Sequence, residues 1–178
     1  MISCESSESK ILDFNSFEIE VPKDWKKLKL KGIDSYVGGI ITKSNDTLIF
    51  DLGYYSGDVS TNSGEMVYDS IFISELKKGE NNSSSPKLNM RIDSIFESLD
   101  TKKYRRYNVK YDSIDCFSAK IITSEIKGFS ATGIYIDELK KGDINATRFS
   151  FYGNRLSDSV QKQFLKALKS LNFKAYCK

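Results

Sequence analysis

The stretch Phe17-Glu18-Ile19-Glu20-Val21-Pro22-Lys23-Asp24-Trp25 decides the class of fold that the sequence predicts. Its first five residues alternate between apolar and acidic, which is the two-residue period of a half-buried β-strand. Pro22, Lys23 and Asp24 are turn residues by composition, and Trp25 opens a second strand in which apolar residues interleave with lysines. We therefore expect the folded part of the chain to begin as two consecutive strands joined by a short turn.

Further strands and two helices follow outward from this stretch. The pattern of apolar residues predicts a helix over 85–99 and another over 157–171, each with one apolar face. Such a pattern favours an α+β fold, an antiparallel sheet of about 7–9 strands packed against a central and a C-terminal amphipathic helix. The remaining strands are expected over 36–42, 47–53, 66–76, 104–110, 117–124, 130–139 and 147–152.

The opening stretch Phe17–Trp25 resembles the first hairpin of PsbP/Mog-like domains. The closing strand, helix and apolar tail over 148–173 are similar to the end of the same domains. The segments 33–38 and 49–56 look like lipoproteins of that type from Bacteroidetes. The resemblance implies an α+β sandwich that serves as a binding or assembly scaffold, usually without catalysis. It carries over no functional residue to this chain.

The N-terminal residues 1–13 are polar and rich in Ser and Glu, so we expect a flexible tether followed by a single domain over 14–178. Met1-Ile2-Ser3-Cys4 resembles the end of a bacterial lipoprotein signal, in which the cysteine becomes the lipidated residue. The charged and apolar parts of such a signal are missing, so a precursor would begin upstream of Met1. This predicts a cell-envelope protein that contacts the membrane only through a lipid anchor on Cys4. The alternative is a chance cysteine in a cytoplasmic protein.

Two further cysteines, Cys116 and Cys177, are candidates for a disulfide. In an oxidising compartment a bridge between them would close a loop of about 60 residues and contribute about 4 kcal/mol in the chain-entropy model. The alternative is two unpaired thiols, because sequence alone does not give the distance between them.

Composition excludes several classes of function. The chain has 178 residues, 27 basic and 24 acidic side chains, a net charge of +3, and no histidine. Without histidine or a C-x-x-C pair we expect no zinc site, and no glycine-rich phosphate loop or calcium loop is present, so we expect no cofactor. The basic residues are dispersed along the chain, which argues against nucleic-acid binding.

Two groups of residues are candidates for binding. In the first, adjacent tyrosines at a strand end are bounded by glycines, which places at least one aromatic ring on the surface; its members are Asp51, Tyr54, Tyr55 and Asp58. In the second, aromatic residues stand among basic ones, as they would on a solvated strand face or on a surface that meets an acidic partner; its members are Tyr104, Arg105, Arg106 and Tyr107.

Three functions remain, in order of preference. The first is a non-catalytic envelope domain that binds another protein or a small ligand. The second is an immunity-type inhibitor that plugs the active site of a toxin, with residues 51–58 as its contact loop. The third is a hydrolase based on carboxylates or a Ser–Lys pair, which a deep pocket of converging polar side chains would favour. We expect a protein partner, and the sequence predicts no oligomeric state.

Overall fold

The computed structural model describes residues 8–61, 67–69, 91–93, 107–125, 131–141, 146–174 and 176. Contacts divide the chain into two compact units, one of Met1–Asn62 with Arg106–Lys178 and one of Ser63–Arg105. The expected single domain over 14–178 is therefore interrupted by a second unit. Within the second unit, the described residues form strands β6 (Val67–Asp69) and β7 (Arg91–Asp93), which pair in parallel.

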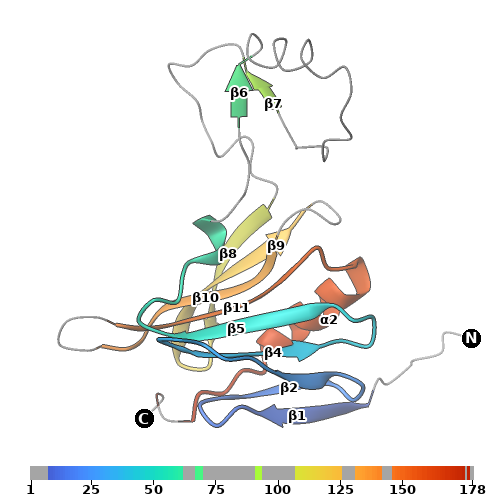
Figure 1. Ribbon diagram of the computed structural model, residues 1–178, viewed down its shortest axis with the longest axis vertical. Helices are drawn as coiled ribbons and strands as arrows, with labels where there is room; N and C mark the ends of the chain where they lie inside the picture. The colour runs from blue at the N-terminus through green and yellow to red at the C-terminus, as the bar shows by residue number, and fades with distance from the viewer. Residues whose placement is uncertain are drawn as a thin grey trace, which may run out of the picture. The chain divides into compact units, whose positions relative to one another are not determined.

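The first unit is built on a seven-stranded antiparallel sheet in the order β3-β4-β5-β11-β10-β9-β8 (Figure 1). Neighbours along the chain pair as hairpins, and the pairing of β5 with β11 joins the N-terminal strands to the C-terminal ones. These strands confirm the sequence prediction of an antiparallel sheet. They are β3 (Lys26–Lys29), β4 (Tyr36–Ile41), β5 (Thr47–Gly53), β8 (Tyr107–Ile114), β9 (Phe117–Ser124), β10 (Ala131–Lys140) and β11 (Thr147–Asn154).

A separate two-stranded hairpin, β1 (Ser9–Asp13) and β2 (Glu18–Pro22), precedes the sheet. The expected tether over 1–13 was therefore wrong from Ser9 onward, and residues 1–7 lie outside the described residues. The prediction failed because β1 exposes most of its side chains, and Leu12 is its one buried residue. Its ladder of hydrogen bonds to β2 supplies the order that its composition does not reveal.

The C-terminal helix α2 (Asp158–Leu168) lies on one face of the sheet, which we call the inner face. It begins as expected, because the side chain of Ser157 accepts a hydrogen bond from the backbone N–H of Val160. Its buried stripe is Val160, Phe164, Ala167 and Leu168. None of the helices in the described ranges is long and apolar enough to cross a membrane.

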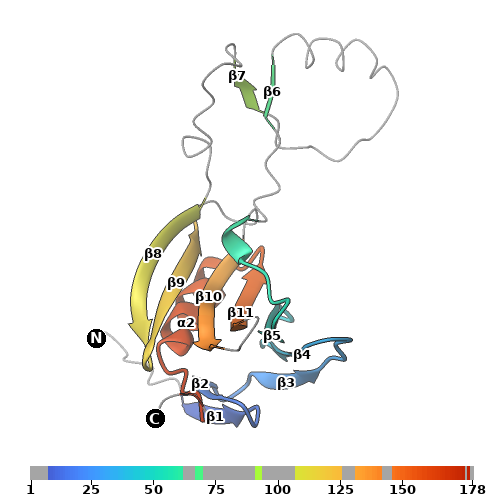
Figure 2. The ribbon, with the colours of Figure 1, turned by 90° about the vertical axis from the view of Figure 1, so that its left-hand side faces the viewer.

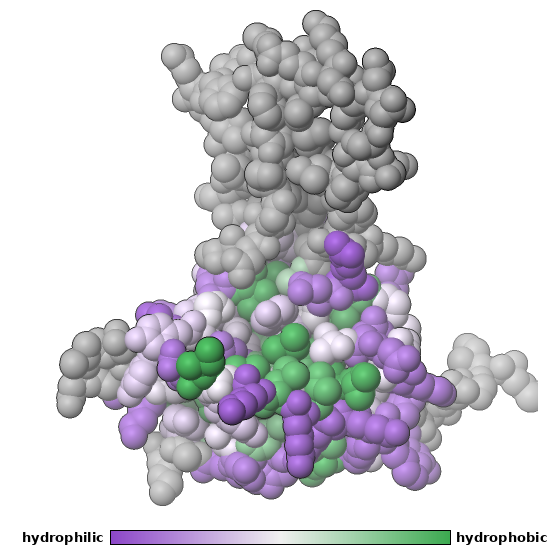
Figure 3. Space-filling view, in the orientation of Figure 1, coloured by the Kyte–Doolittle hydropathy of each residue, from purple (hydrophilic) through white to green (hydrophobic). Residues whose placement is uncertain are grey.

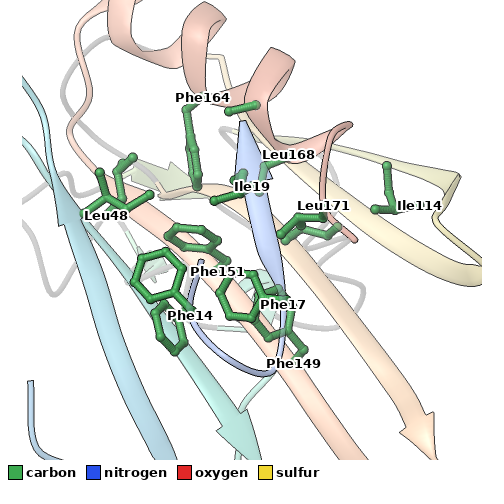
Figure 4. Packing of buried hydrophobic residues seen from close by; sticks show 14 of the residues in the cluster. Phe14, Phe17, Ile19, Leu48, Ile114, Phe149, Phe151, Phe164, Leu168 and Leu171 are labelled. Carbon is green, nitrogen blue, oxygen red and sulfur yellow. The ribbon is translucent and has the colours of Figure 1, made fainter. Parts of the chain in front are cut away.

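Phenylalanine rings fill the space between the hairpin, the sheet and the helix (Figure 4). The Phe17 ring lies 5.1 Å from Phe14, 4.9 Å from Phe50 and 5.1 Å from Phe149, measured between ring centroids. On β4, a Cβ at Gly38 would lie 2.5 Å from the Phe50 ring, so only glycine leaves room for that ring. The core is thus enclosed by the β1–β2 hairpin, the sheet and α2.

The expected central helix over 85–99 is contradicted at its middle. Residues Arg91–Asp93 form strand β7, with Ile92 opposite Tyr68 of β6. Tertiary context routinely overrides a local preference for helix, and here the long-range backbone pairing with β6 prevails over the helical spacing of the apolar residues. The other residues of the expected helix lie outside the described residues.

The turn between β8 and β9 contains Cys116, which is disulfide-bonded. The chain end lies beside this turn, because the backbone N–H of Phe173 donates to Asp115 Oδ2 at 2.9 Å and the rings of Phe117 and Phe173 lie 5.6 Å apart. Cys177 lies outside the described residues, so its pairing with Cys116 stays a prediction that these contacts support.

The buried stripe of α2 generates a test of the core. Phe164 is fully buried, and its ring lies 5.1 Å from Phe151 of β11, as the prediction of a helix packed on the sheet requires. We expect Phe164→Ala to lower the free energy of unfolding by about 3–5 kcal/mol, because it removes a ring and leaves a cavity. Urea denaturation measures the loss. Lys162→Ala, an exposed change on the same helix, is the control and should leave the midpoint nearly unchanged.

The bridge at Cys116 generates a second test. We expect peptide mapping of the unreduced protein to recover one disulfide-linked pair that joins Cys116 to Cys177. Reduction should then lower the thermal midpoint, because the unfolded chain regains the entropy of a long loop. Recovery of Cys116 as a free thiol, or joined to Cys4, would contradict the expected pairing.

Candidate functional site

The outer face of the sheet, opposite α2, carries an open groove of about 460 Å³. Figure 2 shows α2 on one side of β10 and β11 and the short helix η1 (Val59–Thr61) on the other side. The groove lies beside the segment that leads from β5 into η1. Its lining residues are Asp58, Tyr111, Ser118, Lys120, Tyr135, Asp137 and Glu138.

An ion pair between Asp58 and Lys120 closes one side of the groove. The Lys120 ammonium contacts Asp58 Oδ2, and the two side chains are only 21% and 18% exposed. Burial by itself raises the pKa of Asp58, but hydrogen bonds from Lys120 and Ser60 outweigh it and hold this pKa below its ordinary value. Asp58 is therefore a carboxylate throughout the neutral range, and it fixes the position of the lysine.

Tyr135 forms the floor of the groove on β10. Its hydroxyl donates a hydrogen bond to Asp137 Oδ1 at 2.8 Å. Burial and this hydrogen bond raise the pKa of Tyr135 to about 12, so the phenol stays protonated. The Lys120 ammonium lies 5.8 Å from the centre of the Tyr135 ring, within range of a cation–π contact.

Arg148 of β11 continues the network beyond the groove. Its Nε lies 3.2 Å from Asp137 Oδ1 but forms no hydrogen bond there. The contact is therefore an ion pair without the alignment of a hydrogen bond. Its Nη1 donates to the carbonyl oxygen of Tyr54 at 3.2 Å. The charged side chains of β9, β10 and β11 therefore form one network that reaches the loop after β5.

An irregularity in β10 brings two successive carboxylates to the same groove. Ile136 pairs with Phe149 and Lys140 with Thr147, so three residues of β10 lie opposite Arg148 alone. In a regular strand, neighbouring side chains point to opposite faces. Here Asp137 and Glu138 are both exposed and both line the groove, while Leu139 returns to the core.

The structure separates the four residues of the first predicted group. Asp58 belongs to the groove, and Tyr54 and Tyr55 are 51% and 78% exposed. Asp51 is half-buried, its carbonyl oxygen accepts from Ser56 Oγ at 2.9 Å, and its Oδ1 is buried without a hydrogen-bond partner among the described residues. Asp51 therefore supports the loop from beneath and does not present its side chain to a partner.

The second predicted group is described only at Tyr107. This ring is 9% exposed and packs with Val59, Ile122 and Tyr135, and its hydroxyl donates to the carbonyl of Ser60. Tyr107 is therefore a core residue, because its place on β8 puts it under η1, and its expected role on a surface was wrong. The other three members, Tyr104, Arg105 and Arg106, lie outside the described residues.

Sequence reasoning did not select Lys120, Tyr135, Glu138 or Arg148, and all of these except Glu138 lie within an ordinary strand pattern. The one signal in the sequence was Asp137-Glu138, two adjacent carboxylates between apolar residues. A regular strand would turn one of them into the core at high cost, so the pair predicts a strand irregularity. The groove itself depends on strand register, which no local pattern reveals.

Five large hydrophobic side chains are exposed together at one end of the sheet, which we call the tyrosine end. The loop before β4 and the loop after β5 meet there, since a Cβ at Gly53 would lie 2.7 Å from the Cβ of Ser35. Seven large hydrophobic side chains are exposed among the described residues, and five of them belong to this end. They are Leu30, Ile33, Tyr36, Tyr54 and Tyr55.

The outer face of β3, β4 and β5 is also apolar. These strands carry half-buried aliphatic side chains along their length (Leu28, Val37, Ile41 and Ile49). Figure 3 shows hydrophobic residues gathered over β4 and β5. The groove and the apolar part of the outer face thus occupy different strands of one sheet.

No protein-family model matches the chain, and no curated protein matches it. Among solved structures, the chain is similar to the solution structure of cyanobacterial PsbP (CyanoP) from Synechocystis sp. PCC 6803. The identity is 9%, the TM-score is 0.42, and the match covers 96% of this chain and 95% of that chain. A likeness of this degree assigns neither a family nor a function. What the fold shows is a mostly antiparallel sheet with one α-helix among the described residues.

The Asp58–Lys120 pair predicts how stability depends on pH. We expect Asp58→Asn to lower the free energy of unfolding by about 1–3 kcal/mol at neutral pH, because the Lys120 ammonium is left without its carboxylate. The pKa of Asp58 is lower in the folded chain than in the unfolded chain, so its stabilisation is complete above about pH 5 and is lost as the pH falls below about 4.

Urea titrations of the wild type and of Asp58→Asn at several pH values measure this. The difference between the two midpoints should shrink as the pH falls below about 4. Asp112→Asn, a change at an exposed position of β8, is the control and should show no such difference. A constant gap at all pH values would contradict the assignment of the stabilisation to the Asp58 carboxylate.

Proposed function

We propose that this chain is a non-catalytic binding domain of the cell envelope whose outer groove takes a ligand that carries a positive charge. The observation that carries the proposal is the groove's set of charged side chains, three carboxylates and one ammonium. Its volume of about 460 Å³ lies within the range of small-ligand sites, about 300–1,000 Å³. The ligand is an organic amine, or a Lys or Arg side chain on another protein.

The charges in the groove favour a cation over an anion. Lys120 is matched by Asp58, and Asp137 is shared between Tyr135 and Arg148. Glu138 has no ion-pair partner among the described residues. The exposed Tyr111 lies opposite Lys120 on β8 and offers a ring face beside the carboxylates, which is favourable for a cationic group.

Binding without chemistry is favoured by the same network. A nucleophile must be activated by an adjacent base or by a lowered pKa. Here Lys120 is paired with the Asp58 carboxylate, and the phenol of Tyr135 stays protonated to about pH 12. These pairings stiffen the site, which lowers the entropy lost on binding. They support a binding site over the hydrolase that the sequence left open.

The disulfide at Cys116 supports an exported protein, since such bonds persist in oxidising compartments and are rare in the cytoplasm. We propose the bacterial cell envelope as its compartment, with a lipid on Cys4 as its anchor. Three resemblances are the ground for this finer assignment: the Cys4 stretch resembles a bacterial lipoprotein signal, Phe17–Trp25 resembles PsbP/Mog-like domains, and residues 33–38 and 49–56 resemble Bacteroidetes lipoproteins of that type.

An immunity-type inhibitor is the second candidate. The exposed rings of Tyr54 and Tyr55 favour it, because tyrosine gives a large contact area with a polar tip. In that case the protein would bind and inactivate a toxin encoded beside it, and the groove would receive a basic residue of that toxin.

Titration with simple amines tests the proposal. We expect spermidine, lysine amide or arginine amide to shift the NMR signals of β9 and β10 and to bind with measurable heat. Glu138→Gln should weaken this binding about tenfold or more, because it removes the charge from a charge-assisted hydrogen bond.

Glu125→Gln is the matched control, an exposed glutamate outside the groove, and should leave amine binding unchanged. Binding of an anion such as phosphate in place of the amines would overturn the proposal, as would amine binding that Glu138→Gln does not affect. Free amines and basic peptides tested side by side separate a small-molecule ligand from a protein side chain.

A further inference from the structure

The tyrosine end has the composition of a surface that enters a lipid interface. Ile33 is 97% exposed at the tip of the loop between β3 and β4, and Leu30 in the same loop is exposed as well. Exposure of an isoleucine side chain to water is unfavourable, and most isoleucines in folded proteins are buried. A protruding aliphatic tip reaches below the headgroups of a bilayer, where its transfer from water is favourable.

Three tyrosines lie at the same end of the sheet as this tip. Tyr36 begins β4 next to the loop, and Tyr54 and Tyr55 follow β5 at the same end of the sheet. Tyrosine is enriched where a protein meets the headgroup region, since its ring is apolar and its hydroxyl remains hydrated. The tyrosine end therefore combines an aliphatic tip with the side chain suited to the layer above it.

Lysines provide the charge at this end. Lys29 and Lys31 flank Leu30, and Lys140 and Lys141 lie where β10 reaches the same end, since β10 ends beside the start of β11, which pairs with Gly53. All four are exposed, and none forms an ion pair with the residues that the structure describes. Asp34 is the one acidic residue of the β3–β4 loop.

The choice of lysine as the basic residue also distinguishes between a protein partner and an anionic membrane. Protein interfaces are depleted of lysine and enriched in arginine, whereas an anionic bilayer attracts either charge without a requirement for geometry. Lysine stems can also lie along the acyl boundary while the ammonium reaches the phosphates. The basic residues free of ion pairs here are lysines, and they flank aliphatic side chains, so charge complementarity favours a membrane over a protein.

We propose that the tyrosine end is a docking surface for the anionic headgroup layer of a lipid bilayer, with Ile33 and Leu30 inserted and the four lysines on the phosphates. This contact is separate from a lipid anchor on Cys4 and from the groove. It gives the domain a second attachment, and a peripheral protein held by two weak attachments stays bound far longer than one held by either alone.

Flotation with vesicles tests the proposal on the chain without any lipid on Cys4. We expect the protein to float with phosphatidylcholine vesicles that contain phosphatidylglycerol, and to stay in solution with phosphatidylcholine alone or at high salt. Ile33→Asp should abolish flotation. Replacement of Lys29 by alanine should lower the partition coefficient about fivefold, as should the same change at Lys31.

Matched variants elsewhere on the fold control for exposure and charge. Ile11→Asp changes another exposed isoleucine, on β1, and Lys162→Ala changes an exposed lysine on α2, and both should float like the wild type. No flotation, equal flotation with neutral vesicles, or an unchanged result with Ile33→Asp would overturn the proposal. A discrete protein adduct from a photo-crosslinker at position 33 in cells, without vesicle binding, would assign this end to a protein partner instead.

Discussion

The rest of the first unit depends on the packing of the Phe17 ring against its neighbouring aromatic rings. The Phe17 ring stands between the β1–β2 hairpin and the sheet, and it touches rings from the start of the chain, from β5 and from β11. The Phe173 ring, beyond α2, closes on it at 5.9 Å. Close packing of this kind tolerates few changes in volume, so the hairpin, the central strands and the chain end hold one arrangement together.

That arrangement also determines the outer face. Because side chains alternate along a strand, fixing Phe149 and Phe151 inward turns Arg148, Ser150 and Tyr152 outward. On β10 the same rule turns Tyr135 toward Lys120 of β9. A shift of one residue in either strand would bury these charges and expose the phenylalanines, so core packing and groove chemistry depend on one register.

Local pattern was sufficient for the parts of the fold that repeat with a short period. The alternation in β2 and β5 and the apolar stripe of α2 each report which face meets the core, and the structure agrees. It was insufficient for β1, whose order comes from its partner strand, and for β7, where long-range pairing replaces the expected helix. The groove as a whole could not be predicted, because Asp58 and Lys120 are 62 residues apart and meet only through register.

The loop after β5 joins the groove to the tyrosine end, and its attachments explain how one exposed segment can be well positioned. Ser56 Oγ lies 3.0 Å from Ser150 Oγ beneath the loop, the Tyr54 carbonyl accepts from Arg148, and Asp58 pairs with Lys120. These three contacts reach β11 and β9, which the phenylalanine core holds in place. Tyr54 and Tyr55 are therefore presented by a short segment that is held at both ends, so less conformational entropy is lost when they meet a partner surface.

Contacts of Arg148 also link the groove to the tyrosine end. Asp137 in the groove contacts Arg148, and Arg148 contacts the loop after β5. A cation bound at Asp137 would compete with Arg148 for that carboxylate. Arg148 is also the residue that holds the loop after β5 through the Tyr54 carbonyl.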